Sequence, residues 1–148
     1  MRTFPLVALV LFSTAFASCT SITVEPLSAE LQVQEICIQN NPKVIVEDFL
    51  LVIQEGLARH GIKATLHTGS VPAECEYLMT YTARQSWDGV PYLSHAEILI
   101  EHKGARVGYG EYHLIGKAAF SLLKWQSTNI KMDPVLDELF EEYLQEQP

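Results

Sequence analysis

The strongest constraint on the fold of this chain is the regular alternation of polar and apolar side chains between residues 75 and 114. The alternation runs through three segments, 75–87, 92–102 and 106–114. Asp88-Gly89 and Lys103-Gly104-Ala105 supply turn residues between them. A period of two is typical of strands that bury one face, and turns this short join antiparallel neighbours. The sequence therefore predicts an antiparallel meander. In its middle segment the expected inward-facing residues are Tyr92, Ser94, Ala96, Ile98 and Ile100.

Further strands and two amphipathic helices are expected to complete the fold. Strands are expected over 31–39 and 63–67, and helices over 46–60 and from Asp133-Pro134 onward. Asp133 is expected to be the N-cap and Pro134 the first helical residue. Each helix carries one apolar stripe, which is most simply buried against one face of a single sheet. The predicted fold is a two-layer α+β domain of order β-α-β-β-β-β-α, with a mainly antiparallel sheet and both helices on one face.

Residues 1–18 have the pattern of a bacterial lipoprotein signal peptide. Arg2 precedes an apolar run over 4–16 that is too short to span a bilayer, and two small residues stand directly before Cys19. Phe16 departs from the Leu that usually precedes the small pair. We expect cleavage before Cys19 and acylation of its sulfur. An ordinary secretory signal and an uncleaved anchor are the alternatives.

The residues after Cys19 indicate where the anchored chain is held. Thr20 stands where an Asp would retain a lipoprotein at the inner membrane in enteric-type sorting, so an outer-membrane address facing the periplasm is expected. A single acyl chain gives only marginal membrane binding, whereas several chains give firm attachment. Residues 19–30 lack clear periodicity and are interpreted as the acylated Cys and a flexible tether. One globular domain is expected over 31–148.

The charge of the mature chain argues against one class of partner. Arg2 is the only charged residue of positions 1–18, so cleavage leaves nine Lys and Arg against eighteen Asp and Glu, a net charge of −9. Nucleic acid needs clustered Lys and Arg to neutralise its phosphates. We therefore expect neither a nucleic-acid partner nor a basic patch that binds anionic lipid.

The signal peptide also determines how the cysteines are interpreted. Once Cys19 is acylated, Cys37 and Cys75 remain, and two thiols in the oxidising periplasm usually pair. We expect a Cys37–Cys75 disulfide. The alternative is a reactive cysteine or a metal ligand, which the lack of a C-x-x-C pair disfavours.

Two aromatic dipeptides are candidates for a binding surface. Trp87-Asp88 ends a predicted strand, and Lys124-Trp125 lies in a stretch of mixed signals. An exposed indole beside a charge is typical of partner-binding sites. The alternative is structural, with each Trp covering the edge of the core and Asp88 shaping a turn.

Two histidines and two glutamates are candidates for a metal site. If His102 pairs with Arg106 across the predicted hairpin, then His95 lies opposite His113 and Glu97 opposite Glu111 on one outward face. Imidazole and carboxylate groups at that spacing suit Zn²⁺ or a similar ion. The alternative is a solvated face, and a slip of one residue would separate the histidines.

Several segments resemble motifs of a known family. They are Cys75-x-Tyr77, Tyr81-Thr82-Ala83, Trp87-Asp88, Tyr92-Leu93, Lys124-Trp125-x-Ser127-Thr128, Asp133-Pro134 and Asp137-Glu138-Leu139. With the signal sequence, they resemble the Sbal-type family of small Gram-negative lipoproteins. The resemblance implies a lipoprotein with an α/β core, and it transfers no activity and no site residue.

The sequence contains no motif typical of an enzyme. We find no phosphate loop, dinucleotide fingerprint, metalloprotease helix or nucleophile elbow. We therefore expect a non-enzymatic envelope lipoprotein without a cofactor, which binds another envelope protein as an accessory or scaffold factor. The alternative is a small-ligand or metal-binding lipoprotein, using either the histidine face or an aromatic group of Tyr77, Tyr81, Trp87 and Tyr92.

Overall fold

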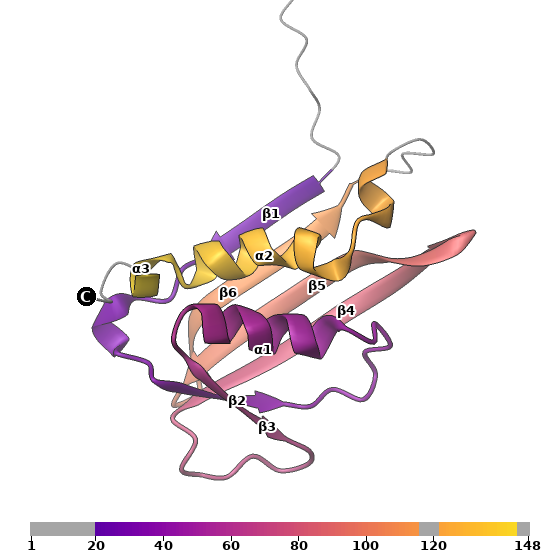
Figure 1. The fold of residues 1–148 in the computed structure, drawn as a ribbon. Helices are drawn as coiled ribbons and strands as arrows, with labels where there is room; N and C mark the ends of the chain where they lie inside the picture. The colour runs from indigo at the N-terminus through magenta and orange to yellow at the C-terminus, as the bar shows by residue number, and fades with distance from the viewer. Residues whose placement is uncertain (1–19, 116–121, 145–148) are drawn as a thin grey trace, which may run out of the picture.

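One mixed sheet with helices on a single face makes up the fold (Figure 1). The computed structural model describes residues 20–115 and 122–144. The strands are β1 (Thr20–Glu25), β2 (Glu35–Gln39), β3 (Lys63–His67), β4 (Tyr77–Asp88), β5 (Val90–His102) and β6 (Ala105–Leu114). The helices are α1 (Phe49–Arg59), α2 (Thr128–Leu139) and α3 (Glu141–Leu144), with short 3₁₀ turns η1 (Ala29–Leu31) and η2 (Leu122–Trp125).

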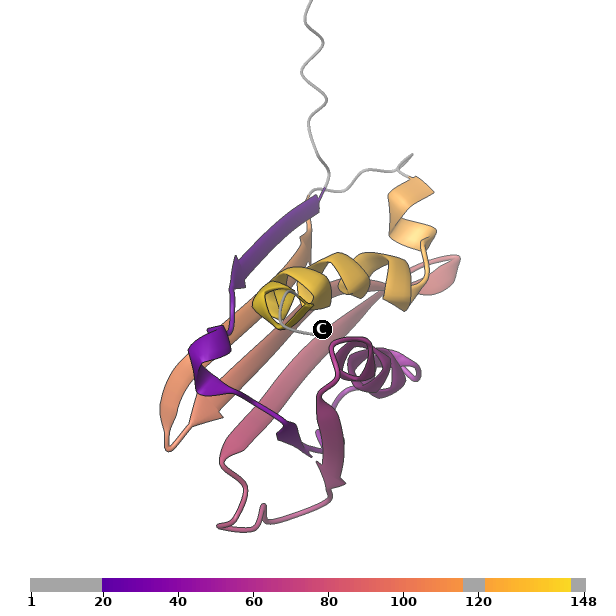
Figure 2. The same ribbon diagram turned by 60° about the vertical axis from the view of Figure 1, so that its left-hand side comes forward.

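The strands lie in the order β1-β6-β5-β4-β2-β3. β2 runs parallel to both β3 and β4, and the other neighbours are antiparallel. The helices α1 and α2 pack side by side on one face, as both views show (Figures 1 and 2). The predicted two-layer α+β fold, with its mainly antiparallel sheet, is therefore confirmed.

Two glycines allow α2 to approach its neighbours closely. A Cβ at Gly110 of β6 would lie 2.7 Å from Val135 Cγ1, and a Cβ at Gly56 of α1 would lie 2.6 Å from Leu136 Cδ1. Both distances are too short for real atoms, so α2 packs at this depth only against residues without side chains. The core lies in this layer and includes Ile36, Ile38, Phe49, Ile53, Leu57, Met79, Ile98, Ile100, Met132, Val135, Leu136, Leu139 and Phe140.

The expected tether over 19–30 is wrong for the residues that the structure describes. Thr20–Glu25 form β1, which pairs with β6 from Thr20↔Leu114 to Glu25↔Tyr109. The strand forms because Ile22 and Val24 alternate with polar residues beside an edge that β6 would otherwise leave unpaired. The folded domain therefore includes Thr20–Glu25 and does not begin near residue 31.

The predicted start of the last helix is also wrong. α2 begins at Thr128 after Ser127, so Pro134 lies inside the helix rather than at its first position. Burial of Met132 on the side facing the core compensates for the backbone hydrogen bond that Pro134 cannot donate. Asp133 also lies inside α2 and is therefore not an N-cap. Its carboxylate instead pairs with Arg59 of α1 at 3.0 Å.

A β-bulge reverses the expected faces at the start of β5. Arg84 pairs with His95 and Gln85 pairs with Leu93, which leaves Ser94 as an extra residue. Leu93 is consequently buried, whereas Tyr92 and Ser94 are partly exposed. The inward faces expected for Ala96, Ile98 and Ile100, which follow the bulge, are confirmed.

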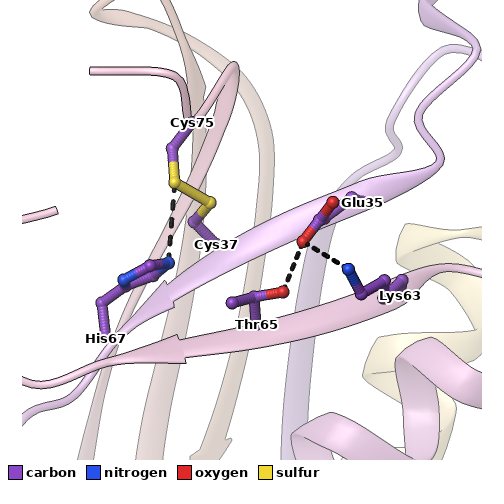
Figure 3. Close-up of a disulfide and its surroundings, with 6 residues drawn as sticks. All are labelled: Glu35, Cys37, Lys63, Thr65, His67 and Cys75. Carbon is purple, nitrogen blue, oxygen red and sulfur yellow. Dashed lines mark hydrogen bonds and ion pairs between the residues drawn. A yellow bond between two sulfur atoms is a disulfide. The ribbon is translucent and has the colours of Figure 1, made fainter. Parts of the chain in front are cut away.

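The expected disulfide joins Cys37 of β2 to Cys75 in the loop before β4, across a sequence separation of 38 (Figure 3). It lies on the sheet face opposite the helices, and the Cys75 sulfur is 3.7 Å from His67 Nε2. Beside it, Glu35 accepts hydrogen bonds from Lys63 and from the Thr65 hydroxyl of β3 (Figure 3). The disulfide thus ties the loop over 68–76 to the parallel end of the sheet.

Replacing both cysteines, in Cys37→Ala/Cys75→Ala, is expected to lower the free energy of unfolding. For a closed loop of this size, the chain-entropy model gives a loss of about 4 kcal/mol. Urea unfolding followed by circular dichroism measures the change. Dithiothreitol should lower the midpoint of the wild type by the same amount and leave that of the variant unchanged. Equal midpoints for the oxidised wild type and the variant would contradict the prediction.

Candidate functional site

The two aromatic dipeptides singled out in the sequence meet at one end of the sheet. Asp88 ends β4, Lys124 and Trp125 belong to η2, and the Lys124 ammonium forms an ion pair with the Asp88 carboxylate. The same ammonium lies 4.5 Å from the centre of the Trp125 ring. Lys124 is buried by these contacts, whereas Trp87 is 73% exposed and Trp125 is 45% exposed.

Four more apolar side chains are exposed at this end, namely Val90, Ile115, Leu122 and Leu123. We call these four, together with Trp87 and Trp125, the aromatic end. β4 ends here, β5 starts here, and β6 ends here, because the three strands are antiparallel neighbours. Both views place the start of β1 and η2 at this same end of the sheet (Figures 1 and 2). The aromatic end therefore brings exposed apolar side chains from four segments of the chain to one end of the sheet.

A buried lysine that the sequence analysis missed supports this surface. The Lys131 ammonium donates to the backbone oxygens of Leu93, at 2.9 Å, and Lys124, at 2.7 Å. It also lies 5.6 Å from the ring centre of Tyr92 and 5.9 Å from that of Tyr112. Burial lowers the pKa of Lys131 to about 8. The sequence feature that could have indicated this role is the position of Lys131, four residues before Val135 and therefore on the apolar side of α2.

The expected group of four aromatic side chains is not a single site. Tyr77 and Tyr81 are buried in the core, and the Tyr77 hydroxyl donates to the backbone oxygen of Leu31. Trp87 instead lies exposed at the tip of the β4–β5 hairpin. A hollow of about 590 Å³ does lie beside Trp125, and it is lined by residues that include Ile45, Tyr92 and Thr128.

The histidine and glutamate candidates come together on the open face of the sheet, which is the face opposite the helices. His95 pairs with His113 and Glu97 with Glu111, as predicted. His95 Nε2 lies 2.8 Å from Glu111 Oε1 and 3.9 Å from Glu97 Oε1. Donor atoms of these three residues all lie within 4.8 Å of one another, which is close enough for them to share one metal ion. We call His95, Glu97 and Glu111 the histidine–glutamate cluster.

His113 lies beside the cluster but outside the donor set, with its ring edge-on to His95 at 5.2 Å. The assumed pairing of His102 with Arg106 is wrong, because His102 pairs with Ala105 around a tight Lys103-Gly104 turn. The register shifts between Ile100 and Glu101. The turn is one residue shorter than predicted, and this register shift makes up for the difference. The predicted pairing of His95 with His113 is therefore restored.

Tyr109 completes the cluster and was missed by the sequence analysis. Its hydroxyl lies 3.4 Å from Glu97 and 3.3 Å from Glu111, within hydrogen-bond reach of both carboxylates. Burial and the two neighbouring carboxylates raise the pKa of Tyr109 to about 12. The hydrogen bond from His95 holds the pKa of Glu111 below its usual value. The signal for Tyr109 was its position two residues before Glu111, on the same face of β6.

Cys19, the predicted acylation site, and the signal peptide lie outside the described residues. None of the helices in the part of the chain that is described has the length and apolar character needed to cross a membrane.

A search of solved structures identifies proteins with a similar fold. A PelC dodecamer from Paraburkholderia phytofirmans has a subunit that matches with a TM-score of 0.54 and 10% identity, covering 86% of this chain and 99% of that one. A minor lipoprotein from Acinetobacter baumannii matches with a TM-score of 0.34 and 12% identity, covering 77% and 91%. The first match shows a shared fold, and the second is too weak to support any conclusion. No family model and no curated protein sequence matches the chain.

The free energy of unfolding of the wild type is expected to rise between pH 8 and pH 10. Lys131 has a pKa of about 8 when folded and about 10.5 when unfolded, so in this range the unfolded chain binds the extra proton. The gain is at most about 2–3 kcal/mol by proton linkage. Urea unfolding at the two pH values measures it.

Lys131→Met should remove this rise, because methionine carries no titrating group. Lys63→Met is the matched control, since Lys63 is exposed on β3, and it should keep the rise. If the free energy of unfolding rose equally with pH in the wild type and in Lys131→Met, Lys131 would not be the cause of the rise.

Proposed function

We propose that this chain is a bacterial envelope lipoprotein, acylated at Cys19 and held at the outer membrane on its periplasmic side. It works by contact rather than catalysis, as an accessory or scaffold factor that binds another envelope protein. The observation that supports this proposal best is the open face of the sheet, which is covered by none of the described helices (Figure 2) and carries many polar side chains.

The charges on the open face favour a partner with a polar surface over a purely apolar one. Its outward positions carry charged and aromatic side chains that include Glu25, Glu35, Glu97, Arg106, Tyr109 and Glu111. Arg106 pairs with Glu25 across β1 and β6, so these groups already have defined positions. Interfaces between proteins that also exist apart are about as polar as ordinary protein surface. The face therefore suits a partner that binds and releases.

The lipid anchor is supported by the sequence and by the chemistry of the fold. Arg2, the short apolar run and the small residues before Cys19 match a lipoprotein signal. The Cys37–Cys75 disulfide fits an oxidising compartment outside the cytoplasm. A second copy of this chain is one candidate partner, because the PelC domain of similar fold belongs to a dodecamer.

Mass spectrometry of the mature chain is expected to find an acylated Cys19 at the N-terminus, and Cys19→Ala should lack the acyl mass.

After crosslinking in cells, capture of the tagged chain should yield a stoichiometric envelope protein. A second, differently tagged copy identifies self-association. Glu97→Arg/Glu111→Arg should reduce the yield, since it reverses the charge of the open face. Glu138→Arg on α2 is the control. An unmodified Cys19 would overturn the proposed lipid anchor. The absence of a stoichiometric partner would overturn the proposed binding role.

A second candidate function is cation binding by the histidine–glutamate cluster, which the proximity of its donor atoms favours. Zinc titration of the purified protein should then give a saturable heat near one ion per chain. His95→Ala should abolish this heat, because it removes the imidazole donor. His113→Ala should retain it, because His113 lies outside the donor set. A titration without saturable heat would exclude the function.

A further inference from the structure

We propose that the aromatic end rests on the zwitterionic phospholipid surface of the membrane that holds the anchor. Trp87, Trp125 and the exposed apolar side chains around them would then lie at the level of the lipid headgroups. This inference rests on the proposed acylation of Cys19 and extends it from an attachment point to a fixed orientation of the domain.

The first step of the argument is the position of the anchor. Thr20 directly follows Cys19 in the chain, and Thr20 pairs with Leu114 at the end of β6. One residue spans at most about 3.6 Å. The acyl chains would therefore leave the domain at the aromatic end, and no tether separates this end from the bilayer. A flexible segment over 20–30 would have let the domain move away, but residues 20–25 are committed to the sheet.

The second step is the chemistry of the surface at that end. Leu122 is 79% exposed, and Val90 and Ile115 are each 51% exposed beside the two tryptophans. Clusters of exposed apolar side chains on a folded protein mark interaction sites. Indole is the side chain most typical of the membrane–water interface, because its ring is apolar and its N–H is polar. The composition therefore suits a lipid surface.

The third step is the charge and rigidity of the surface. The Lys124 ammonium is buried against Asp88 and Trp125. Because its charge is already paired, it is poorly placed to bind an anionic headgroup. The mature chain carries a net charge of −9, which repels anionic lipid. Lys131 holds the Lys124 backbone in place, so Trp125 is presented from an ordered element. A zwitterionic surface is the lipid class that fits these properties.

Tryptophan fluorescence tests the proposal, because the chain contains only two tryptophans. The full lipidated protein is bound to phosphatidylcholine vesicles, with and without bromine on the acyl chains. Trp87→Phe reports on Trp125 alone, and Trp125→Phe reports on Trp87 alone. In both variants the emission should shift to shorter wavelength and lose intensity with brominated lipid, at low and at high salt.

A tryptophan at the opposite end of the sheet supplies the control. Ala105 is exposed at the far turn of the β5–β6 hairpin. Ala105→Trp in the Trp87→Phe/Trp125→Phe background should show no quenching. The wild type, measured with both lipids, needs no substitution and keeps the test valid if a variant fails to fold.

Flotation of the vesicles separates the possible failures. Protein that floats with the vesicles but is not quenched would overturn the orientation and leave the acyl anchor intact. A shift in emission without bromine quenching would mean that a second copy, and not lipid, covers this end, and it would overturn the proposal. Quenching that requires anionic lipid would contradict the charge argument. Protein that does not float would overturn the anchor, and the orientation with it.

Discussion

The pairing of β1 with β6 is the interaction on which the arrangement of this domain depends. It covers the edge that the meander would otherwise expose, and it brings Thr20 beside Leu114. The chain then reaches the end of α2, where Leu27 is buried and its N–H donates to the Leu139 oxygen at 2.9 Å. A short strand thereby links the sheet to the helical layer and follows directly on Cys19, the proposed point of attachment.

The helical layer depends in turn on one buried cation. Lys131 joins α2 to β5 and to η2 through two backbone oxygens, and this connection holds the aromatic end together. Burying an ammonium without a carboxylate partner is costly, which is why the pKa of Lys131 is depressed to about 8. The domain tolerates this cost at the place where segments distant in the sequence must meet, whereas Lys124 nearby is paired with Asp88.

Local periodicity was sufficient for part of the structure and insufficient for the rest. It predicted β3 at its observed bounds and the disulfide, because these depend on alternation and cysteine count. It also predicted the pairing of His95 with His113, but from a wrong turn that the register shift between Ile100 and Glu101 offsets. It could not predict β1, which needs the β6 edge to form, or the start of α2, where burial of Met132 outweighs the effect of Pro134. The bulge at Ser94 and the role of Lys131 also arise only from tertiary packing.

The disulfide has a consequence for the export that we propose for this chain. The native stability of a domain is typically about 5–15 kcal/mol, and a disulfide that closes a loop of this length accounts for about 4 kcal/mol of it. In the reducing cytoplasm the Cys37–Cys75 bond would not persist. A precursor made there would fold only weakly, and a secretion channel that accepts unfolded chains could thread it easily. If the chain is exported as proposed, oxidation after translocation would complete the fold, and the compartment would determine when the domain becomes stable.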